Sequence, residues 1–155
     1  MSNRSKRVAR YRVGLNPDRP LVVAEGALVA CGSDASRIAS AALAGLVSER
    51  LIVIGLNSRN RVVGIVTVAE GGDSALCVHA KEVLRAALLL GGTAFVLAHN
   101  HPGGDPFPSP NDLAFTKKVS EGSRAIGTNL VDHVVVAPEA GTHYSFLEHG
   151  LLEEV

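Results

Sequence analysis

Apolar and polar positions follow two different periods along the chain, and these periods predict where strands and helices lie. The short apolar run 93–98 is typical of a strand that is buried on both faces. Another apolar run, 51–56, is followed by the turn-forming residues 57–60 and by the run 62–68, so we expect a hairpin of two strands. The remaining predicted strands are 21–23, 27–29 and 130–137.

Three other stretches have apolar residues at every third or fourth position, which is the period of an amphipathic helix. The first follows the N-cap candidates Ser33-Asp34, and the second covers about 79–90 and stops at Gly91-Gly92, because glycine commonly follows a helix. The third runs from 110 to about 121. Helices and strands in this mixed order, after an early hairpin, predict one α/β (α+β) domain with a mixed sheet flanked by helices.

Size and charge limit the class of protein. A chain of 155 residues with 46% hydrophobic and 19% charged residues suits one globular domain. Basic residues without any acid mark the N-terminus, so we expect 1–20 to be a disordered basic tail and 21–155 to be the folded domain. A phosphate-binding arm is the alternative for the tail. A net charge of zero and few aromatic residues argue against a broad nucleic-acid surface.

Two further features concern the compartment. No apolar run approaches the length of a membrane span and no secretory signal is visible, so we expect a cytoplasmic protein without a membrane partner. Cys31 and Cys77 are isolated thiols without the spacing of a redox or metal pair. We expect both to be small buried hydrophobic residues in a reducing compartment.

Candidate chemistry is concentrated just after the apolar run 93–98. His99 and His101 are two residues apart at the end of a predicted strand, so both imidazoles can face one metal ion. The Gly- and Pro-rich residues 103–108 then turn the chain, and Asp112 can return to supply an oxygen. Two imidazoles and one carboxylate leave a fourth tetrahedral position for water, as in a catalytic zinc site. The sequence therefore predicts one zinc ion per chain, bound by these three residues.

The same residues also have a purely structural interpretation. A His-X-His pair is weak evidence by itself, and Ser109, Pro110 and Asp112 occupy positions that make a good helix start. The metal site is favoured because both halves lie within fourteen residues, joined by an exposed loop. Spacing does not identify the base that would take a proton from water. The available glutamates include Glu25, Glu49, Glu70 and Glu82.

The spacing of His99, His101, Ser109 and Asp112, with proline after the second histidine, resembles the JAMM pattern of the MPN-domain zinc hydrolases. The surrounding residues are similar, more narrowly, to the bacterial RadC-like JAB domain. The later matching pieces are Leu130-Val131-Asp132-His133 and Ser145-Phe146-Leu147-Glu148-His149-Gly150-Leu151. The resemblance covers about residues 35–152. It implies a single MPN/JAB-type domain with cytidine-deaminase-like layering.

The resemblance also implies an activity and further site residues. It implies a zinc-dependent metallohydrolase, a peptidase or isopeptidase, in which metal-bound water attacks an amide of a protein or peptide. Glu49, just before the first core strand, matches the family's general base. Ser109 matches the serine on the oxyanion side, whose hydroxyl can donate to the developing charge. Apart from the resemblance, Asp132 and His133 lie at the start of a predicted strand, where either could orient a metal ligand by a hydrogen bond or serve a purely structural role.

The chain departs from the family pattern in three places. Gly103 stands where a serine usually follows His-Pro, and Ala80 stands where proline is common. The 155 residues leave no room for the helix-hairpin-helix DNA-binding region of larger members, which weakens an inherited role in DNA repair. The alternatives to an enzyme are a non-catalytic MPN-fold binding module and a DNA-repair accessory protein. Because every expected ligand is present, the enzyme is favoured.

Overall fold

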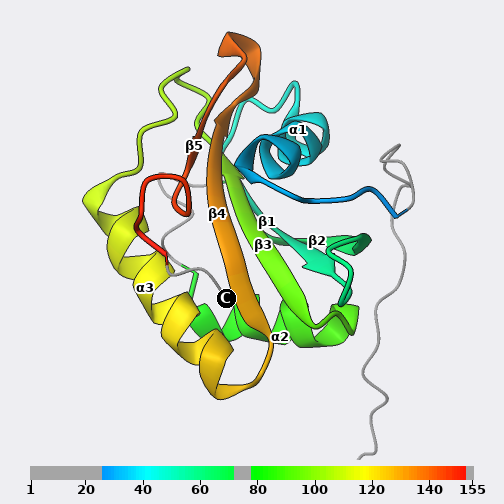
Figure 1. Cartoon of the computed structure of the whole chain (residues 1–155). Coiled ribbons are helices and arrows are strands. Elements are labelled where there is room, and N and C mark those ends of the chain that lie inside the picture. The colour runs from blue at the N-terminus through cyan, green and yellow to red at the C-terminus, as the bar shows by residue number, and fades with distance from the viewer. Residues whose placement is uncertain (1–25, 72–77, 153–155) are drawn as a thin grey trace, which may run out of the picture.

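A computed structural model describes residues 26–71 and 78–152 (Figure 1). The predicted tail 1–20, the predicted strand 21–23, Glu25 and Cys77 lie outside the described residues. The described elements are, in chain order, α1 (Gly32–Leu43), β1 (Arg50–Leu56), β2 (Val62–Glu70), α2 (Ala80–Leu90), β3 (Ala94–Asn100), α3 (Pro110–Ala125), β4 (Asn129–Ala137), the 3₁₀ turn η2 (Pro138–Ala140) and β5 (Thr142–Ser145).

The five strands form one mixed sheet in the order β2-β1-β3-β4-β5. The predicted hairpin is the antiparallel pair β1–β2, and β1 also pairs antiparallel with β3. β3 and β4 are parallel, and β5 returns antiparallel along β4. Because α3 connects the two parallel strands, it lies over the sheet in Figure 1. The prediction of one α+β domain on a mixed sheet is confirmed.

Apolar side chains on the two faces of the sheet build two separate cores. Alternate residues of β1 divide between them: Leu51 and Val53 pack with residues of α2 and α3, whereas Ile52 and Ile54 pack with residues of α1. This division follows from the strand itself, in which successive side chains point to opposite faces. The helices therefore cover both faces of the sheet, as Figure 1 shows.

The central strand β3 determines where the candidate site lies. Its residues are buried on both faces, as the apolar run predicted. Phe95 and Leu97 belong to the core on the α2 and α3 side, whereas Val96 and Ala98 belong to the core on the α1 side. By the same alternation His99 faces the α3 side.

Several boundaries differ from the predictions. α1 begins at Gly32 with Cys31 in the N-cap position, so the predicted caps lie inside the first turn. The carboxylate of Asp34 accepts a hydrogen bond from the backbone N of Ala30 at 3.0 Å instead of capping the helix. Cys31 is exposed, so the prediction of a buried thiol is wrong for this residue.

The other differences concern weak strands and helix ends. α3 continues to Ala125, four residues beyond the predicted end. Residues 27–29 form no strand, and their only ladder contact in the described part of the chain is an isolated bridge between Leu28 and Arg61. β5 was not predicted from the sequence. None of the helices in the described ranges is both long and apolar enough to cross a membrane.

Candidate metal centre

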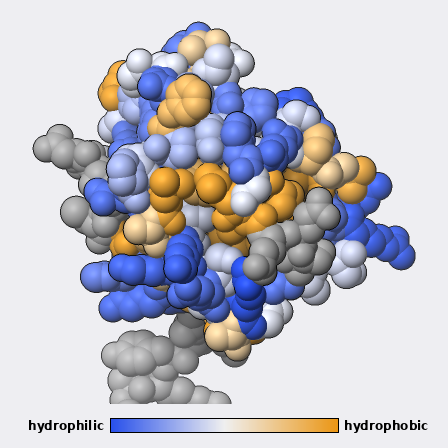
Figure 2. All heavy atoms as spheres, turned by 60° about the vertical axis from the view of Figure 1, so that its left-hand side comes forward, coloured by the Kyte–Doolittle hydropathy of each residue, from blue (hydrophilic) through white to orange (hydrophobic). Residues whose placement is uncertain are grey.

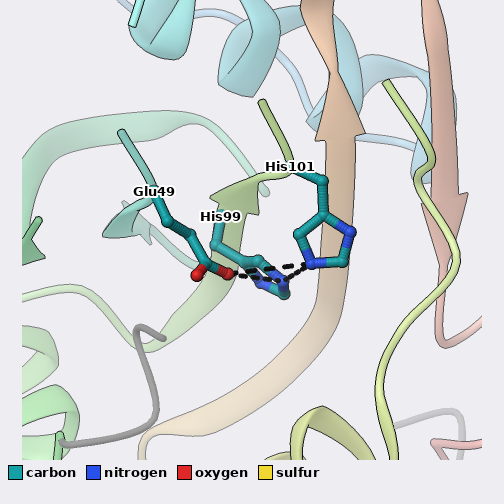
Figure 3. A group of neighbouring side chains, drawn as sticks. All are labelled: Glu49, His99 and His101. Atoms are coloured by element: carbon teal, nitrogen blue, oxygen red, sulfur yellow. Dashed lines mark hydrogen bonds and ion pairs between the residues drawn. The ribbon is translucent and has the colours of Figure 1, made fainter. Parts of the chain in front are cut away.

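Three of the predicted site residues come together at one end of the strand pair β1–β3 (Figure 3). His99 is in β3, and His101 follows directly after that strand. Leu51 pairs with His99 in the antiparallel ladder, so Glu49, two residues earlier in the chain, comes opposite His101. The register of two central strands therefore brings together side chains that are fifty residues apart in sequence.

The distances between these side chains suit a shared cation. The Nε2 atoms of His99 and His101 are 3.0 Å apart. Oε1 of Glu49 is 3.8 Å from Nε2 of His99 and 3.7 Å from Nε2 of His101. Two ligand atoms that each lie about 2.0–2.1 Å from a tetrahedral zinc are separated by about 3.3 Å. The three donor atoms could therefore surround a metal ion after only small side-chain movements.

Asp112 faces the same histidines from α3. Its Oδ1 is 3.6 Å from Nε2 of His99, and its Oδ2 is 3.9 Å from Nε2 of His101. The carboxylate is held by the predicted helix cap, because Oδ2 accepts hydrogen bonds of 2.7 Å from both the backbone N and Oγ of Ser109. These bonds engage Oδ2 and leave Oδ1 directed at His99. The structural and the metal-binding interpretations of Asp112 are therefore compatible.

His99 and His101 each use Nδ1, the ring nitrogen that does not face the carboxylates, to contact the rest of the protein. Nδ1 of His99 lies 2.8 Å from Nε2 of His133, and Nδ1 of His101 lies 2.8 Å from the backbone O of Asp105. His101 is thus fixed by the turn that follows it, and His99 by a residue of β4. Both rings present Nε2 to the two carboxylates.

Asn100 lies between the two histidines and faces the opposite side of β3. Its side chain accepts a hydrogen bond from the backbone N of Arg50 at 2.8 Å and donates one to the backbone O of Ser48 at 3.0 Å. These two contacts fix the backbone on either side of Glu49. Only 1% of Asn100 is exposed, so water does not compete for these bonds. Asn100 therefore ties the segment that carries Glu49 to the strand that carries the histidines.

Burial keeps the imidazoles of His99 and His133 neutral. Burial, opposed in part by the carboxylate of Asp112 and assisted by His101, lowers the pKa of His99 to about 4. Burial, with a smaller contribution from both neighbouring histidines, lowers the pKa of His133 well below its ordinary value. A neutral imidazole is the form that binds a metal ion, so His99 needs to lose no proton for binding near pH 7.

The remaining predicted site residues take different positions. The hydroxyl of Ser109 donates to Oδ2 of Asp112, so in this structure Ser109 caps α3 and orients the carboxylate. Donation from Ser109 to an oxyanion stays a prediction that requires the hydroxyl to rotate. Glu70 forms an ion pair with Arg50, and Glu82 caps α2 by accepting a bond from the backbone N of His79.

Asp132 and His133 separate into two roles. The carboxylate of Asp132 accepts hydrogen bonds from Oγ of Ser145 at 2.6 Å and from the backbone N of Leu147 at 3.0 Å, so it holds the C-terminal turn to β4. Burial raises the pKa of Asp132. His133, the next residue, points to the other face of β4 and contacts His99.

Two residues of the site region were not identified from the sequence. Asn100 lies inside the histidine motif, but its partners are backbone atoms at the start of β1 and just before it, so no spacing reveals them. Thr116 is four residues after Asp112, on the same face of α3, and its hydroxyl lies 2.6 Å from Nδ1 of His133. The four-residue spacing on a helix was the available signal for Thr116.

The surface on the α3 side combines apolar and charged residues. Figure 2 is turned so that this side comes forward, and it shows a central patch of hydrophobic side chains with hydrophilic ones around it. A cleft of about 520 Å³ lies between α3 and the C-terminal segment, and its lining includes Leu113, Leu151 and Thr116. Phe107, in the loop between His101 and Ser109, is 68% exposed and contacts the ring of Tyr144.

Comparison with known proteins gives a consistent match. Residues 29–151 match the family model of the RadC-like JAB domain. A UPF0758 protein of Symbiobacterium thermophilum is 42% identical over 110 residues, which cover 71% of this chain and 46% of the relative. A UPF0758 protein of Listeria welshimeri is 39% identical over 112 residues (72% and 50%), and one of Rubrobacter xylanophilus is 34% identical over 143 residues (92% and 59%). The chain thus spans about half the length of the curated relatives it matches.

Proposed function

Because the chain belongs to the RadC-like JAB domain family, we propose that it is a zinc-dependent hydrolase that cleaves an amide bond in a protein or peptide. One observation carries the proposal: the Nε2 atoms of His99 and His101 lie 3.0 Å apart and face the carboxylates of Glu49 and Asp112 at 3.6–3.9 Å. Such a group of donors suits a divalent cation. It is also the group that an amide hydrolase needs around its reacting water.

His99, His101 and Asp112 would hold the metal. Imidazole nitrogen and carboxylate oxygen in an open tetrahedral arrangement favour zinc among the common divalent metals. A zinc ion held there would supply Lewis-acid chemistry, acidifying water and polarising the substrate carbonyl. The protein supplies the orientation, because His133 and the backbone O of Asp105 hold the two imidazoles and the capping box of α3 holds the carboxylate.

Glu49 would be the general base. Its carboxylate is close to both histidines and its side chain is 18% exposed, so water can reach it. From there it can accept a proton from the attacking water and return it to the leaving amine. Ser109 would donate its hydroxyl to the oxyanion after rotating away from Asp112.

Peptide hydrolysis by the zinc-loaded protein tests this proposal. We expect Glu49→Gln to lower the rate of cleavage in a mixed peptide library by about 10²–10⁴-fold, because glutamine cannot accept the proton. Glu70→Gln is the matched control, since Glu70 is the other glutamate beside β1 and its side chain pairs with Arg50 at the surface. We expect it to cleave at close to the wild-type rate. Equal rates for wild type and Glu49→Gln would contradict the role of Glu49.

A further inference from the structure

A line of buried hydrogen bonds leads from His99 to the backbone of Asp112. Nδ1 of His99 is 2.8 Å from Nε2 of His133. Nδ1 of His133 is 2.6 Å from Oγ1 of Thr116, and that hydroxyl donates to the backbone O of Asp112 at 2.6 Å. The line therefore begins on one proposed metal ligand and ends on another, and it joins β3, β4 and α3.

The donor and the acceptor of each hydrogen bond follow from the last group in the line, the backbone O of Asp112. A backbone carbonyl can only accept, so the single hydroxyl proton of Thr116 is used in the bond to Asp112. Oγ1 of Thr116 must then accept from His133, which places the proton of His133 on Nδ1. In the neutral ring Nε2 carries a lone pair and accepts from His99, so His99 is protonated on Nδ1.

The surroundings of His133 fit this neutral ring. The residue has no exposed surface, and it stacks on Phe146 with ring centroids 4.6 Å apart and planes 18° apart. Thr116 is only 2% exposed, so little solvent reaches its hydroxyl. The order of the bonds is therefore set by the protein alone.

We propose that His133 and Thr116 are positioning residues that hold His99 in the tautomer protonated on Nδ1, with the Nε2 lone pair directed at the metal position. The inference rests on the proposed function only in that a metal is the group to be bound. It adds Thr116 to the site and gives His133 a defined role, and both residues would affect the metal entirely through His99. A neutral imidazole suits this position, because it accepts at one ring nitrogen and donates at the other.

His101, the second proposed histidine ligand, is held in the same tautomer by a different hydrogen bond. Nδ1 of His101 faces the backbone O of Asp105, which can only accept, so His101 is also protonated on Nδ1. When both rings are neutral, two lone pairs face each other at 3.0 Å. A bound cation would remove this repulsion. The line of hydrogen bonds thus prepares His99, and the loop prepares His101, for one shared ion.

The tautomer is measurable without metal and without a substrate. Nitrogen-15 NMR of the imidazoles in chelator-treated protein distinguishes protonated from unprotonated ring nitrogens, and we expect His99 to be protonated on Nδ1. Thr116→Val removes the acceptor for His133 while keeping the side-chain shape, so His133 can change tautomer and donate to His99. We expect this variant to raise the fraction of His99 protonated on Nε2. Thr116→Ser keeps the hydroxyl and should restore the wild-type spectrum.

Zinc affinity gives the second readout. Loss of a group that orients a metal ligand typically weakens binding by about 10–100-fold, so we expect a loss in this range for Thr116→Val and for His133→Phe. Ser123→Ala is the matched control, because Ser123 is another buried hydroxyl of α3, bonded to the backbones of Ser120 and Leu130. It removes comparable hydrogen bonds away from the site. We expect its zinc affinity and His99 tautomer to equal those of wild type.

The failure of this inference and that of the proposed function are distinguishable. A zinc-binding protein whose metal-free His99 is protonated on Nε2 would overturn the inference. So would a Thr116→Val variant that keeps the wild-type tautomer and affinity. A wild-type protein with the expected tautomer that binds no zinc would overturn the proposed function instead. Circular dichroism identifies any variant that fails to fold, and Thr116→Ser against Thr116→Val then decides the matter.

Discussion

At the scale of single residues, the site depends on which atom of each side chain faces the histidine pair. Asp112 shows this most clearly, because Ser109 engages one carboxylate oxygen and leaves the other directed at His99. His101 shows it as well, because a backbone carbonyl holds its far nitrogen. Each proposed ligand is thus oriented by a hydrogen bond on its far side, an arrangement that is common around metal sites.

Changes at Asp112 and Ser109 should have different effects. Asp112→Asn removes an anionic donor, so we expect weaker zinc binding with a folded domain. Ser109→Ala removes the N-cap of α3, so we expect a loss of about 1 kcal/mol in the free energy of unfolding. Zinc affinity should fall less in Ser109→Ala, because the carboxylate itself remains. Chemical denaturation and competitive zinc titration measure the two quantities, and a Ser109→Ala variant that binds zinc more weakly than Asp112→Asn would contradict these roles.

At the scale of elements, the site is made by the register between strands and by the start of one helix. β1 and β3 are joined on one face of the sheet by Asn100, whose side chain bonds to the backbone on both sides of Glu49. The amide of Asn100 contacts neither histidine. Replacing this side chain therefore tests how Glu49 is positioned without changing a proposed metal ligand.

Asn100→Ala tests this coupling. The variant leaves the backbone O of Ser48 and the backbone N of Arg50 without their partner, which typically costs about 1–3 kcal/mol in the free energy of unfolding. We expect zinc content to remain at the wild-type level while peptide cleavage falls, because Glu49 is no longer held beside the histidines. Zinc analysis and the hydrolysis assay are done on the same preparation. A variant with wild-type cleavage would show that Asn100 does not position Glu49.

The elements also show what the sequence can and cannot reveal. β3 and the capping box at Ser109 could be predicted, because a continuous apolar run and a local hydrogen-bond pattern are written in consecutive residues. β5 could not, because its four residues are stabilised by pairing with β4 and not by an apolar pattern of their own. The start of α1 was misplaced because its N-cap residue, Cys31, makes no side-chain cap.

The same distinction applies to the site. The grouping of His99, His101 and Asp112 could be predicted from local spacing. Glu49 was placed with them only by resemblance, because its proximity to the histidines depends on the pairing of β1 with β3. The four-residue spacing puts Thr116 on the face of α3 that carries Asp112, but its contact with His133 could not be predicted, since it depends on how α3 packs over β4. Long-range contacts of this kind are set by tertiary packing and leave no periodic signal.

At the scale of the whole molecule, buried neutral histidines link stability to pH. The pKa of His99 is about 4 in the folded protein, below the ordinary value near 6.5 that applies after unfolding. Between these values the unfolded chain binds more protons than the folded one, so stability rises with pH and is lost as pH falls from 6.5 towards 4. The lowered pKa of His133 acts in the same direction.

We therefore expect the metal-free protein to lose stability through this pH window. The slope should approach about 1.4 kcal/mol per pH unit for each such histidine. Denaturant unfolding at several pH values in the presence of a chelator measures the slope, and His133→Phe should make it shallower by removing one of the groups. A free energy of unfolding that stays constant from pH 7 to pH 5 would contradict the buried neutral state.

The most direct test of the proposed centre is the zinc content of the purified protein. Wild type, His101→Ala and His143→Ala are loaded with excess zinc, desalted and analysed for metal per chain. His143 is an exposed histidine of β5 and serves as the matched control. We expect about one zinc per chain in wild type and in His143→Ala, and little or none in His101→Ala, because a catalytic zinc site needs three protein ligands. Equal zinc content in wild type and His101→Ala would contradict the assignment of the metal centre.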